Sequence, residues 1–545
     1  MEPDHGSILH GVRFAQDMLR KCTSRQGPHV NCGRQSSLFL PKRVLFVGAE
    51  NEGIHLVDSA GQSKGEYVAL SHCWGPPEHQ PLRLLSKNKA SLTRSVPWDL
   101  LSAVFRDAIR FCRQVGIPYL WIDSLCIQQD SKEDWEVEAA KMAQYYENAL
   151  VTLSVECSPD GTVPFLVERA DSWRPYQFTL VDGSGRQRQV TARRHDLLMD
   201  RPESKLLPTR AWTMQEGLLS RRVIHFTPSD VRWECCAGSR FEDGLSLWSS
   251  FHTYHDGFAD YQRLIANPSS DSVAPEAIFD CWWDIVWGYS RRRLTKVSDK
   301  LPALSGVVTK FRQRLGAKAR YHAGIWEDDL FLGLLWEREH HTTIVPGPTQ
   351  YLAPSWSWAS LESGVQPRFR KSHDVRSCEA MTSGLPPRLI DVACHVPGLN
   401  PFGEVESGFM VLEAPMIEVD LEAKGQAYFV SFPPRQRVGD NGNQYFVEYV
   451  MADCLLTELE GCAVRDDRNQ TVIMQDGALP ALHTKAWVLW LRYGESSGIT
   501  AQALALGRKR NGAFCRLGFI DVVNIRNEYE ARFVTEAQVF RVRIE

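Results

Sequence analysis

The chain has 545 residues, of which 43% are hydrophobic and 23% charged, and its formal net charge is -4 at pH 7. This composition is typical of soluble globular proteins, and a slightly acidic chain has no overall basic field to recruit nucleic acid. No apolar run approaches the roughly 20 residues that span a bilayer, and no secretion signal opens the sequence. We therefore expect a cytoplasmic protein with no membrane span and no nucleic-acid partner.

The 14 cysteines are scattered along the chain, and only Cys235 and Cys236 are adjacent. In the absence of a secretion signal they are expected to be reduced intracellular thiols. The close Cys and His spacings that are typical of structural zinc modules are missing. The sequence therefore predicts no metal site.

The sequence pattern divides the chain into five parts. Residues 1–65 are polar and broken by glycines, and apart from a strand predicted at residues 43–47 they are interpreted as an irregular lead-in. The other four predicted parts are an α/β core at 66–240, a mostly helical, Trp-rich region at 241–361, a linker or long loop at 362–407, and a β-rich domain at 408–545.

Three apolar runs alternate with two helical patterns in the α/β part. Strands are predicted at residues 67–71, 119–122 and 149–155. Between them, apolar residues recur every three or four positions after Pro97, which suits the first turn of a helix, and again after an S-x-x-D capping box at residues 131–134. Strands and helices that alternate in this way predict two βαβ units and a parallel sheet.

The rest of the chain contains shorter predicted elements. A hairpin is expected at residues 178–190 and a short helix at 210–219. Trp356 and Trp358 alternate as on a strand, so they would share one face, and core packing is favoured over a ligand platform. Beyond residue 408, strands are predicted at 409–412, 428–432, 445–450, 486–492, 514–522 and 539–544.

Polar side chains follow the first two strands of the predicted sheet. Residues 71–75 read SHCWG, and Asp123 comes directly after the second strand. Ligands of open parallel sheets bind beyond the carboxyl ends of the strands, so these residues are expected at one edge, where the helix at 210–219 would join them. The candidate site comprises Ser71, His72, Cys73, Trp74, Asp123, Ser124, Arg210, Trp212, Gln215 and Glu216.

His72 and Cys73 each have two interpretations. His72 is a candidate general acid or base because its pKa lies near neutrality, or else a core histidine that fixes the following loop. Cys73 is a candidate nucleophile, which needs a nearby base, or else a small buried apolar side chain. If both residues lie on a strand, their side chains point to opposite faces, and the base for Cys73 must come from elsewhere.

The two acidic residues are also open to two interpretations. Asp123 is a catalytic or ribose-binding acid, because a carboxylate at the end of a buried strand is costly unless it is paired or faces a cleft. Alternatively, it is a helix N-cap or an ion-pair partner of Arg210. Glu216 is a general base or a group that polarises a sugar, while Arg210 binds a phosphate or neutralises Glu216.

The other candidate residues, Ser71, Trp74, Ser124, Arg210, Trp212 and Gln215, are expected to contact a ligand, although packing is the more natural role for Trp212. The G-x-S-x-G elbow of hydrolases, the dinucleotide fingerprint and the P-loop are all missing from the sequence. Kinase, dehydrogenase and serine-hydrolase functions therefore have no support.

Three sequence blocks carry a family resemblance. Residues 69–75 (ALSHCWG), 121–130 (WIDSLCIQQD) and 210–216 (RAWTMQE) resemble, in order and spacing, the signature blocks of fungal heterokaryon incompatibility (HET) domains. Later segments, up to PSWSWAS at residues 354–360, resemble sequences that commonly follow these blocks. The resemblance covers roughly residues 40–360.

The resemblance implies a function and a fold. HET domains act in fungal nonself recognition, in which an incompatible partner triggers programmed cell death, so the expected partner is a protein from an incompatible allele. Their similarity to Toll/interleukin-1 receptor (TIR) domains implies a TIR-like doubly wound parallel sheet. Some proteins of that fold cleave NAD with a glutamate, which makes NAD a candidate substrate and Glu216 or Asp123 the candidate residue. The alternative is a stand-alone enzyme that acts on a small metabolite in secondary metabolism.

Overall fold

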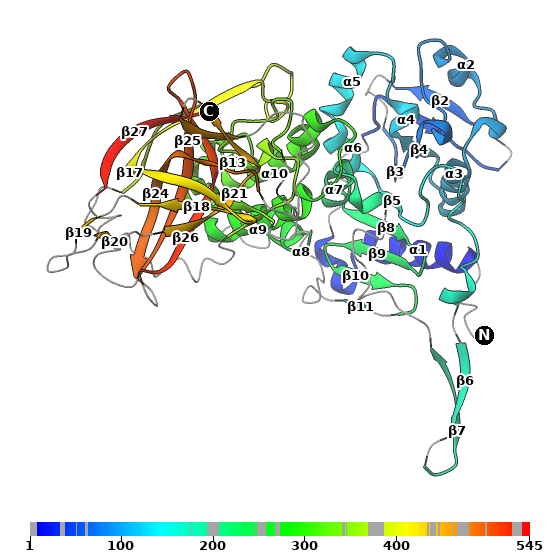
Figure 1. Ribbon diagram of the computed structural model, residues 1–545. Helices are drawn as coiled ribbons and strands as arrows, with labels where there is room; N and C mark the ends of the chain where they lie inside the picture. The colour runs from blue at the N-terminus through cyan, green and yellow to red at the C-terminus, as the bar shows by residue number, and fades with distance from the viewer. Residues whose placement is uncertain are drawn as a thin grey trace. The chain divides into compact units, whose positions relative to one another are not determined.

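The computed structural model divides into two compact units, Met1–Asp271 and Ser272–Glu545 (Figure 1). The residues that the structure describes are 8–32, 39–50, 52–59, 64–174, 176–181, 183–192, 206–244, 246–247, 258–266, 273–339, 344, 346–368, 386–432, 435–436, 443–444, 447–459, 461–465, 479–495, 499–525 and 537–545. No helix among these residues is both long and apolar enough to cross a membrane.

A nine-stranded mixed sheet organises the first unit, in the order β11-β10-β9-β8-β5-β3-β4-β1-β2. Its strands are β1 (Arg43–Phe46), β2 (His55–Asp58), β3 (Tyr67–Ser71), β4 (Tyr119–Ile122), β5 (Val151–Val155), β8 (Arg222–Phe226), β9 (Val231–Cys235), β10 (Gly238–Phe241) and β11 (Ser246–Leu247). The central strands β4, β3, β5 and β8 are parallel, which confirms the predicted α/β class. The remaining strands add antiparallel edges.

The strand order reverses at β3. β4 pairs with one side of β3 and β5 with the other, so the chain crosses β3 on its way from β4 to β5. All five residues of β3 are buried. A strand that is covered on both faces is expected to have a continuous apolar run in place of alternating apolar and polar residues. The reversal puts a topological switch point at the carboxyl ends of β3 and β5.

Helix α3 (Ala103–Val115) connects β3 to β4. The Ser102 side chain accepts the Phe105 N–H, and Gly116, with φ +76°, ends the helix. The predicted start at Pro97 is wrong, because Pro97 precedes a separate 3₁₀ turn and the capping group is Ser102. The other helices of this unit are α1 (Ile8–Thr23), α2 (Lys89–Arg94), α4 (Asp123–Cys126), α5 (Lys132–Ala139), α6 (Met142–Asn148), α7 (Trp212–Leu219) and α8 (Phe258–Tyr261).

The short α4 and then α5 and α6 connect β4 to β5, and α5 and α6 take the place of the one helix that the sequence predicts after Ser131. Ser131 caps α5 by accepting the Asp134 N–H at 3.2 Å, which confirms the predicted N-cap. The reciprocal half of the capping box is replaced, because the Asp134 carboxylate accepts the Gln128 N–H at 2.9 Å. A turn at Ala140 and Lys141 separates α5 from α6. The predicted hairpin is also confirmed, with β6 (Tyr176–Val181) paired to β7 (Gln187–Ala192), as Figure 1 shows.

Helix α1 contradicts the interpretation of residues 1–65 as irregular apart from one strand. Val12, Ala15, Met18 and Cys22 are buried along one side of this helix, which contacts α3 and β9. These four side chains recur every three or four positions, so the apolar pattern of an amphipathic helix is present in the sequence. Packing against α3 and β9 buries that side of the helix.

The helices α9 (Pro275–Ser290) and α10 (Ser305–Leu315) begin the second unit, together with the short α11 (Leu330–Gly333). Trp282 and Trp358 both donate their indole N–H to the Gly324 carbonyl, at 3.1 and 2.9 Å. Trp356 and Trp358 are fully buried, as expected for core packing. The strand predicted for these two residues is wrong, because Trp358 begins a 3₁₀ turn. The Ser357 hydroxyl caps this turn by accepting the Ala359 N–H.

A ten-stranded sheet completes the second unit and confirms its β-rich C-terminal part. Its strands are β16 (Arg388–His395), β17 (Ser407–Lys424), β18 (Ala427–Ser431), β21 (Val447–Ala452), β22 (Leu456–Leu459), β23 (Cys462–Arg465), β24 (His483–Glu495), β25 (Ile499–Arg508), β26 (Phe514–Ile525) and β27 (Gln538–Ile544). The sheet closes on itself, because β17 pairs with both β18 and β24. The remaining short strands are β12 (Tyr321–His322), β13 (Ile325–Trp326), β14 (Trp336–Arg338), β15 (Val365–Pro367), β19 (Arg435–Gln436) and β20 (Asn443–Gln444).

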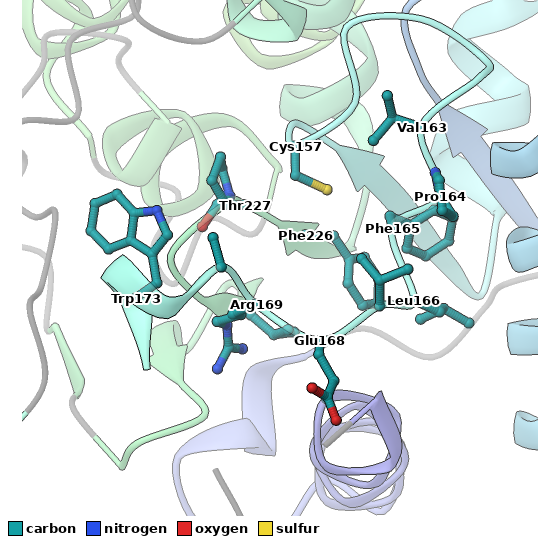
Figure 2. Close-up of a pocket in the computed structure, with 15 residues that line it drawn as sticks. Cys157, Val163, Pro164, Phe165, Leu166, Glu168, Arg169, Trp173, Phe226 and Thr227 are labelled. Atoms are coloured by element: carbon teal, nitrogen blue, oxygen red, sulfur yellow. The ribbon is translucent and has the colours of Figure 1, made fainter. Parts of the chain in front are cut away.

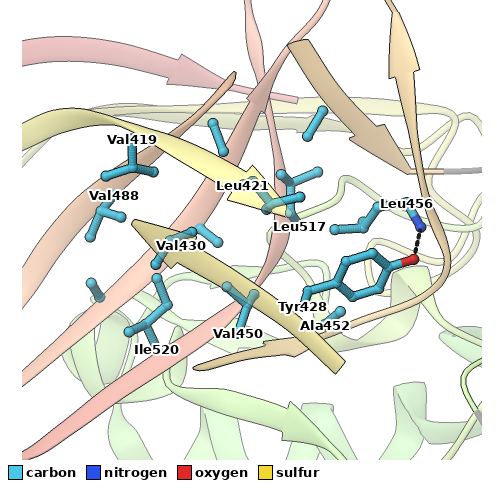
Figure 3. Close-up of a cluster of buried hydrophobic side chains, with 14 of the residues drawn as sticks. Val419, Leu421, Tyr428, Val430, Val450, Ala452, Leu456, Val488, Leu517 and Ile520 are labelled. Atoms are coloured by element: carbon cyan, nitrogen blue, oxygen red, sulfur yellow. Dashed lines mark hydrogen bonds between the residues drawn. The ribbon is translucent and has the colours of Figure 1, made fainter. Parts of the chain in front are cut away.

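Strand β16 lies within residues 362–407, which the sequence suggested to be a linker or long loop, and pairs with β17. Residues 369–385 of that segment lie outside the described residues. Inside the closed sheet, aliphatic side chains from several strands meet around Tyr428, whose hydroxyl accepts the Leu456 N–H at 3.1 Å (Figure 3). Each large aliphatic side chain buried in this way contributes about 1.5–3 kcal/mol to stability.

Candidate functional site

The first two motifs lie at neighbouring strand ends, as predicted. Ser71 is the last residue of β3, and Asp123 begins α4 directly after β4. The two strands are parallel, with Leu70 opposite Ile122. His72 and Cys73 follow β3 rather than belonging to it, so the prediction that they point to opposite faces of a strand does not apply.

Asp123 links the first motif to the second. Its Oδ2 accepts the Trp74 indole N–H at 2.9 Å, and its Oδ1 accepts the Ser124 N–H at 2.7 Å. The second bond satisfies a backbone N–H in the first turn of α4. The carboxylate is thereby held in one orientation, although it is only half-buried. The interpretation of Asp123 as the N-cap is wrong, because Ile122 is the N-cap and Asp123 is the first residue of the helix.

Glu216 is the most perturbed acid of the site. It lies on α7, is 7% exposed, and accepts hydrogen bonds from the hydroxyls of Ser71 and Tyr146. Burial raises the pKa of Glu216 to about 7, with a further contribution from the charge of Asp123, while the two hydroxyls and Arg210 act in the opposite direction. The protonation of Glu216 therefore changes near neutral pH.

Arg210 connects the third motif to the first. Its Nη1 donates to the His72 carbonyl at 3.0 Å, and it also bonds the Cys73 side chain. Burial raises the pKa of Cys73 despite this cation, so the residue is a thiol at neutral pH, which favours the interpretation as a small buried side chain over that as a nucleophile.

His72 is buried and neutral. Burial is the main cause that lowers the pKa of His72 to about 4, with Arg210 acting in the same direction and the charge of Asp123 opposing both. The ring packs edge-on against Phe105, with 5.1 Å between the ring centroids. Its Nε2 is buried and has no hydrogen-bond partner among the described residues. A buried polar atom without a partner is costly, and a ligand with a complementary group would satisfy it.

Three candidate residues lie in the interior or at the margin of this group. Ser124 is fully buried, and its hydroxyl donates to the Leu82 carbonyl at 3.2 Å. Gln215 is also buried, and Trp212 is half-buried at the start of α7. Ser124 thus fixes the loop that contains Leu82.

Two residues of the site were missed by the sequence analysis. Tyr146 lies in the helical pattern that follows the S-x-x-D box, and its hydroxyl bonds Glu216. A tyrosine on the buried face of a helix needs a polar partner, and this need is the signal that the sequence offers. Asp160 acts on Cys73 through its charge and accepts from His79 Nδ1 at 2.8 Å. It lies in a loop, and no pattern in the sequence pointed to it.

Gly75 allows the loop after His72 to approach Asp160. Its φ is +79°, and a Cβ at this position would lie 2.5 Å from the Asp160 Cβ. Gly75→Ala is therefore expected to lower the free energy of unfolding by about 2 kcal/mol or more. Denaturant titration of the first unit checks this, with Gly53→Ala as the control because its Cβ would meet nothing within 4 Å. Equal stability of the two variants would contradict the close approach.

The Glu216 pKa predicts a pH dependence of stability. The ordinary pKa of 4.5 rises to about 7 in the folded chain, so the folded state binds more protons between these values and the free energy of unfolding falls as pH rises through them. The loss is on the order of 3 kcal/mol and is complete above about pH 7. Glu216→Gln should remove this loss, and parallel stability curves for the two proteins between pH 4.5 and 7 would contradict it.

A cavity of about 210 Å³ lies near the carboxyl ends of β5 and β8. Figure 2 shows Phe165, Phe226 and Trp173 around it, with Cys157 at its edge. None of the ten candidate residues lines this cavity. The cavity is therefore separate from the group around Glu216. Among the described residues, no member of that group belongs to a cluster of metal-ligand side chains.

The first unit thus has an α/β fold, and its parallel strands end at a group of hydrogen-bonded polar side chains, most of which are buried. Residues 67–216, from the first residue of β3 to Glu216, match the family model for the heterokaryon incompatibility protein (HET). The chain therefore carries a HET domain over these residues, as the three sequence blocks predicted. No curated protein and no solved structure matches the chain.

Proposed function

We propose that this protein is an effector of heterokaryon incompatibility, which causes cell death on nonself recognition, and that the group around Glu216 is its active site. The observation that carries the proposal is the pair Glu216 and Asp123. Two carboxyl groups in different environments, one with its pKa raised to about 7, form the arrangement that acid–base enzymes use. Both lie inside the residues that match the HET family.

The order of the parallel strands supports a TIR-like doubly wound sheet. Taken as β4-β3-β5-β8, it corresponds to the order 2-1-3-4 of flavodoxin-like folds, whose ligands bind at the switch point between the first and third strands. Ser71 ends the strand at that point, and His72 follows it. A fold-level analogy of this kind gives only the location of the site, and the chemistry has to come from the residues.

We propose NAD as the substrate. In the hydrolysis of its nicotinamide–ribose bond, nicotinamide leaves as a neutral group with the bonding electrons, so positive charge develops on the ribose in the transition state. Water supplies the oxygen that replaces nicotinamide on the ribose. The ionised carboxylate of Glu216 would stabilise that charge and receive the proton of the attacking water. The neutral His72 ring, whose Nε2 has no partner among the described residues, would accept or donate a hydrogen bond to the ligand.

Regulated expression in a fungal host tests the effector role. The full chain would be induced alone and together with candidate partner alleles, and viability scored after hyphal fusion. The proposal expects death in at least one pairing and none when the partner is absent. Survival in every pairing, with the protein present at normal level, would contradict the effector role and leave a stand-alone enzyme of small-molecule metabolism as the better function.

A further inference from the structure

Four metal-ligand side chains meet in the first unit, away from the group around Glu216. We propose that Cys22, His29, Cys32 and Cys235 form a structural zinc site. All four are buried, and their ligand atoms lie within 4.8 Å of one another. Three thiolates and one imidazole are a ligand set of structural zinc sites.

The distances among Cys32, Cys235 and His29 match one face of a tetrahedron around zinc, and the Cys22 sulfur lies within 4.8 Å of their ligand atoms. With Zn–S bonds of about 2.3 Å and a Zn–N bond of about 2.05 Å, tetrahedral geometry requires S–S edges of about 3.8 Å and S–N edges of about 3.5 Å. The sulfurs of Cys32 and Cys235 are 3.7 Å apart. His29 Nδ1 lies 3.4 Å from the Cys32 sulfur and 3.5 Å from that of Cys235. Three edges therefore have the required lengths before any metal is added.

The surrounding charge also suits this ligand set. Zinc with three thiolates and a neutral imidazole carries one net negative charge, which is costly to bury without a partner. Arg222 is 3% exposed, and its Nε donates to the Cys22 sulfur at 3.1 Å. A guanidinium that bonds a ligand sulfur offsets the charge and orients the ligand, as outer-shell groups of metal sites do.

The four ligands come from separate elements. Cys22 lies in the last turn of α1, His29 in the 3₁₀ turn Gly27–Asn31, Cys32 directly after that turn, and Cys235 at the end of β9. The Cys32 N–H bonds the His29 carbonyl at 2.9 Å, which fixes the two residues relative to each other. The metal would tie α1 and its following turn to an antiparallel edge of the sheet.

The sequence predicts no metal site because this arrangement lacks a zinc-module pattern. The N-terminal ligands have the spacing Cys-x₆-His-x₂-Cys, and the fourth follows 203 residues after Cys32. Only the folded chain brings them together, so zinc binding would add directly to the stability of the fold.

Metal analysis of the full chain tests the site. Protein purified under reducing conditions without an affinity tag that binds metals should contain one zinc per chain by mass spectrometry of the element. Cys235→Ser should lower that content to below one fifth, whereas Cys157→Ser, which changes a thiol outside the cluster, should leave it unchanged. Chelation should lower the Tm of wild type and not that of Cys235→Ser.

Cobalt replacement keeps the test valid if Cys235→Ser folds poorly. Wild-type chain loaded with Co²⁺ alone should show the sulfur-to-cobalt charge-transfer absorption and the visible bands of a tetrahedral site. Absence of zinc together with absence of the charge-transfer band would overturn the proposal. So would a disulfide between Cys32 and either Cys235 or Cys236 in the chain isolated from a reducing cytosol; the Cys236 sulfur lies 3.2 Å from that of Cys32.

Discussion

Glu216→Gln is expected to abolish cell killing while leaving the chain folded. Glutamine keeps the shape of the side chain, and its amide oxygen still accepts the hydroxyls of Ser71 and Tyr146, but it cannot carry a charge or exchange a proton. Groups that act as general acids or bases contribute about 10²–10⁴-fold to a rate, so the variant should lose that factor in activity. Viability of the fungal host at matched protein levels measures the effect.

The control for this variant is Glu136→Gln. Glu136 lies on α5 with a side chain that is 43% exposed and 3.8 Å from Lys132, so its substitution should leave killing and stability unchanged. Retention of full killing by Glu216→Gln would assign the buried carboxyl a structural role. Because the variant removes a buried ionisable group, its stability above pH 7 should equal or exceed that of wild type.

Asp453→Ala is expected to destabilise the second unit by about 3–5 kcal/mol, because it leaves buried cations without a carboxylate. Asp453 and Arg516 are both fully buried, with 3.0 Å between Arg516 Nε and Asp453 Oδ2. Arg465 bonds the same oxygen at 2.6 Å. Arg516 also donates to the Leu334 carbonyl at 2.6 Å, so the pair joins the Trp-rich segment to the closed sheet.

Denaturant titration followed by tryptophan fluorescence measures this loss. Asp420→Ala serves as the control, since Asp420 pairs with Lys485 at 2.7 Å with half of its side chain exposed. An exposed pair contributes roughly 0–1 kcal/mol, so the control should unfold close to wild type. A loss below 1 kcal/mol in Asp453→Ala would show that Arg516 and Arg465 find other compensation.

The parallel core was predictable because its strands are buried on both faces. The runs of β3, β4 and β5 are apolar apart from the hydroxyls of Ser71, Thr152 and Ser154, and the S-x-x-D pattern marked the start of α5. Helix α1 has a signal of its own, because Val12, Ala15, Met18 and Cys22 recur at helical spacing. The prediction missed it because the glycines and polar residues of the rest of residues 1–65 favoured an irregular segment.

The site was predictable as a location and not as a set of bonds. Chain direction alone put Ser71 and Asp123 at one edge of the sheet. The bond from Tyr146 to Glu216 could not be foreseen, because it depends on how α6 packs against α7. The same limit applies to the cluster of Cys22 and Cys235, whose members meet only through the folded sheet.

Release of nicotinamide from NAD by the purified chain tests the proposed role of Glu216, which is that of a carboxylate with a pKa of about 7. We expect release by the wild-type chain to rise through pH 7 as Glu216 ionises, and to fall by at least about 10²-fold in Glu216→Gln. No release at any pH, or equal release by wild type and Glu216→Gln, would contradict this role.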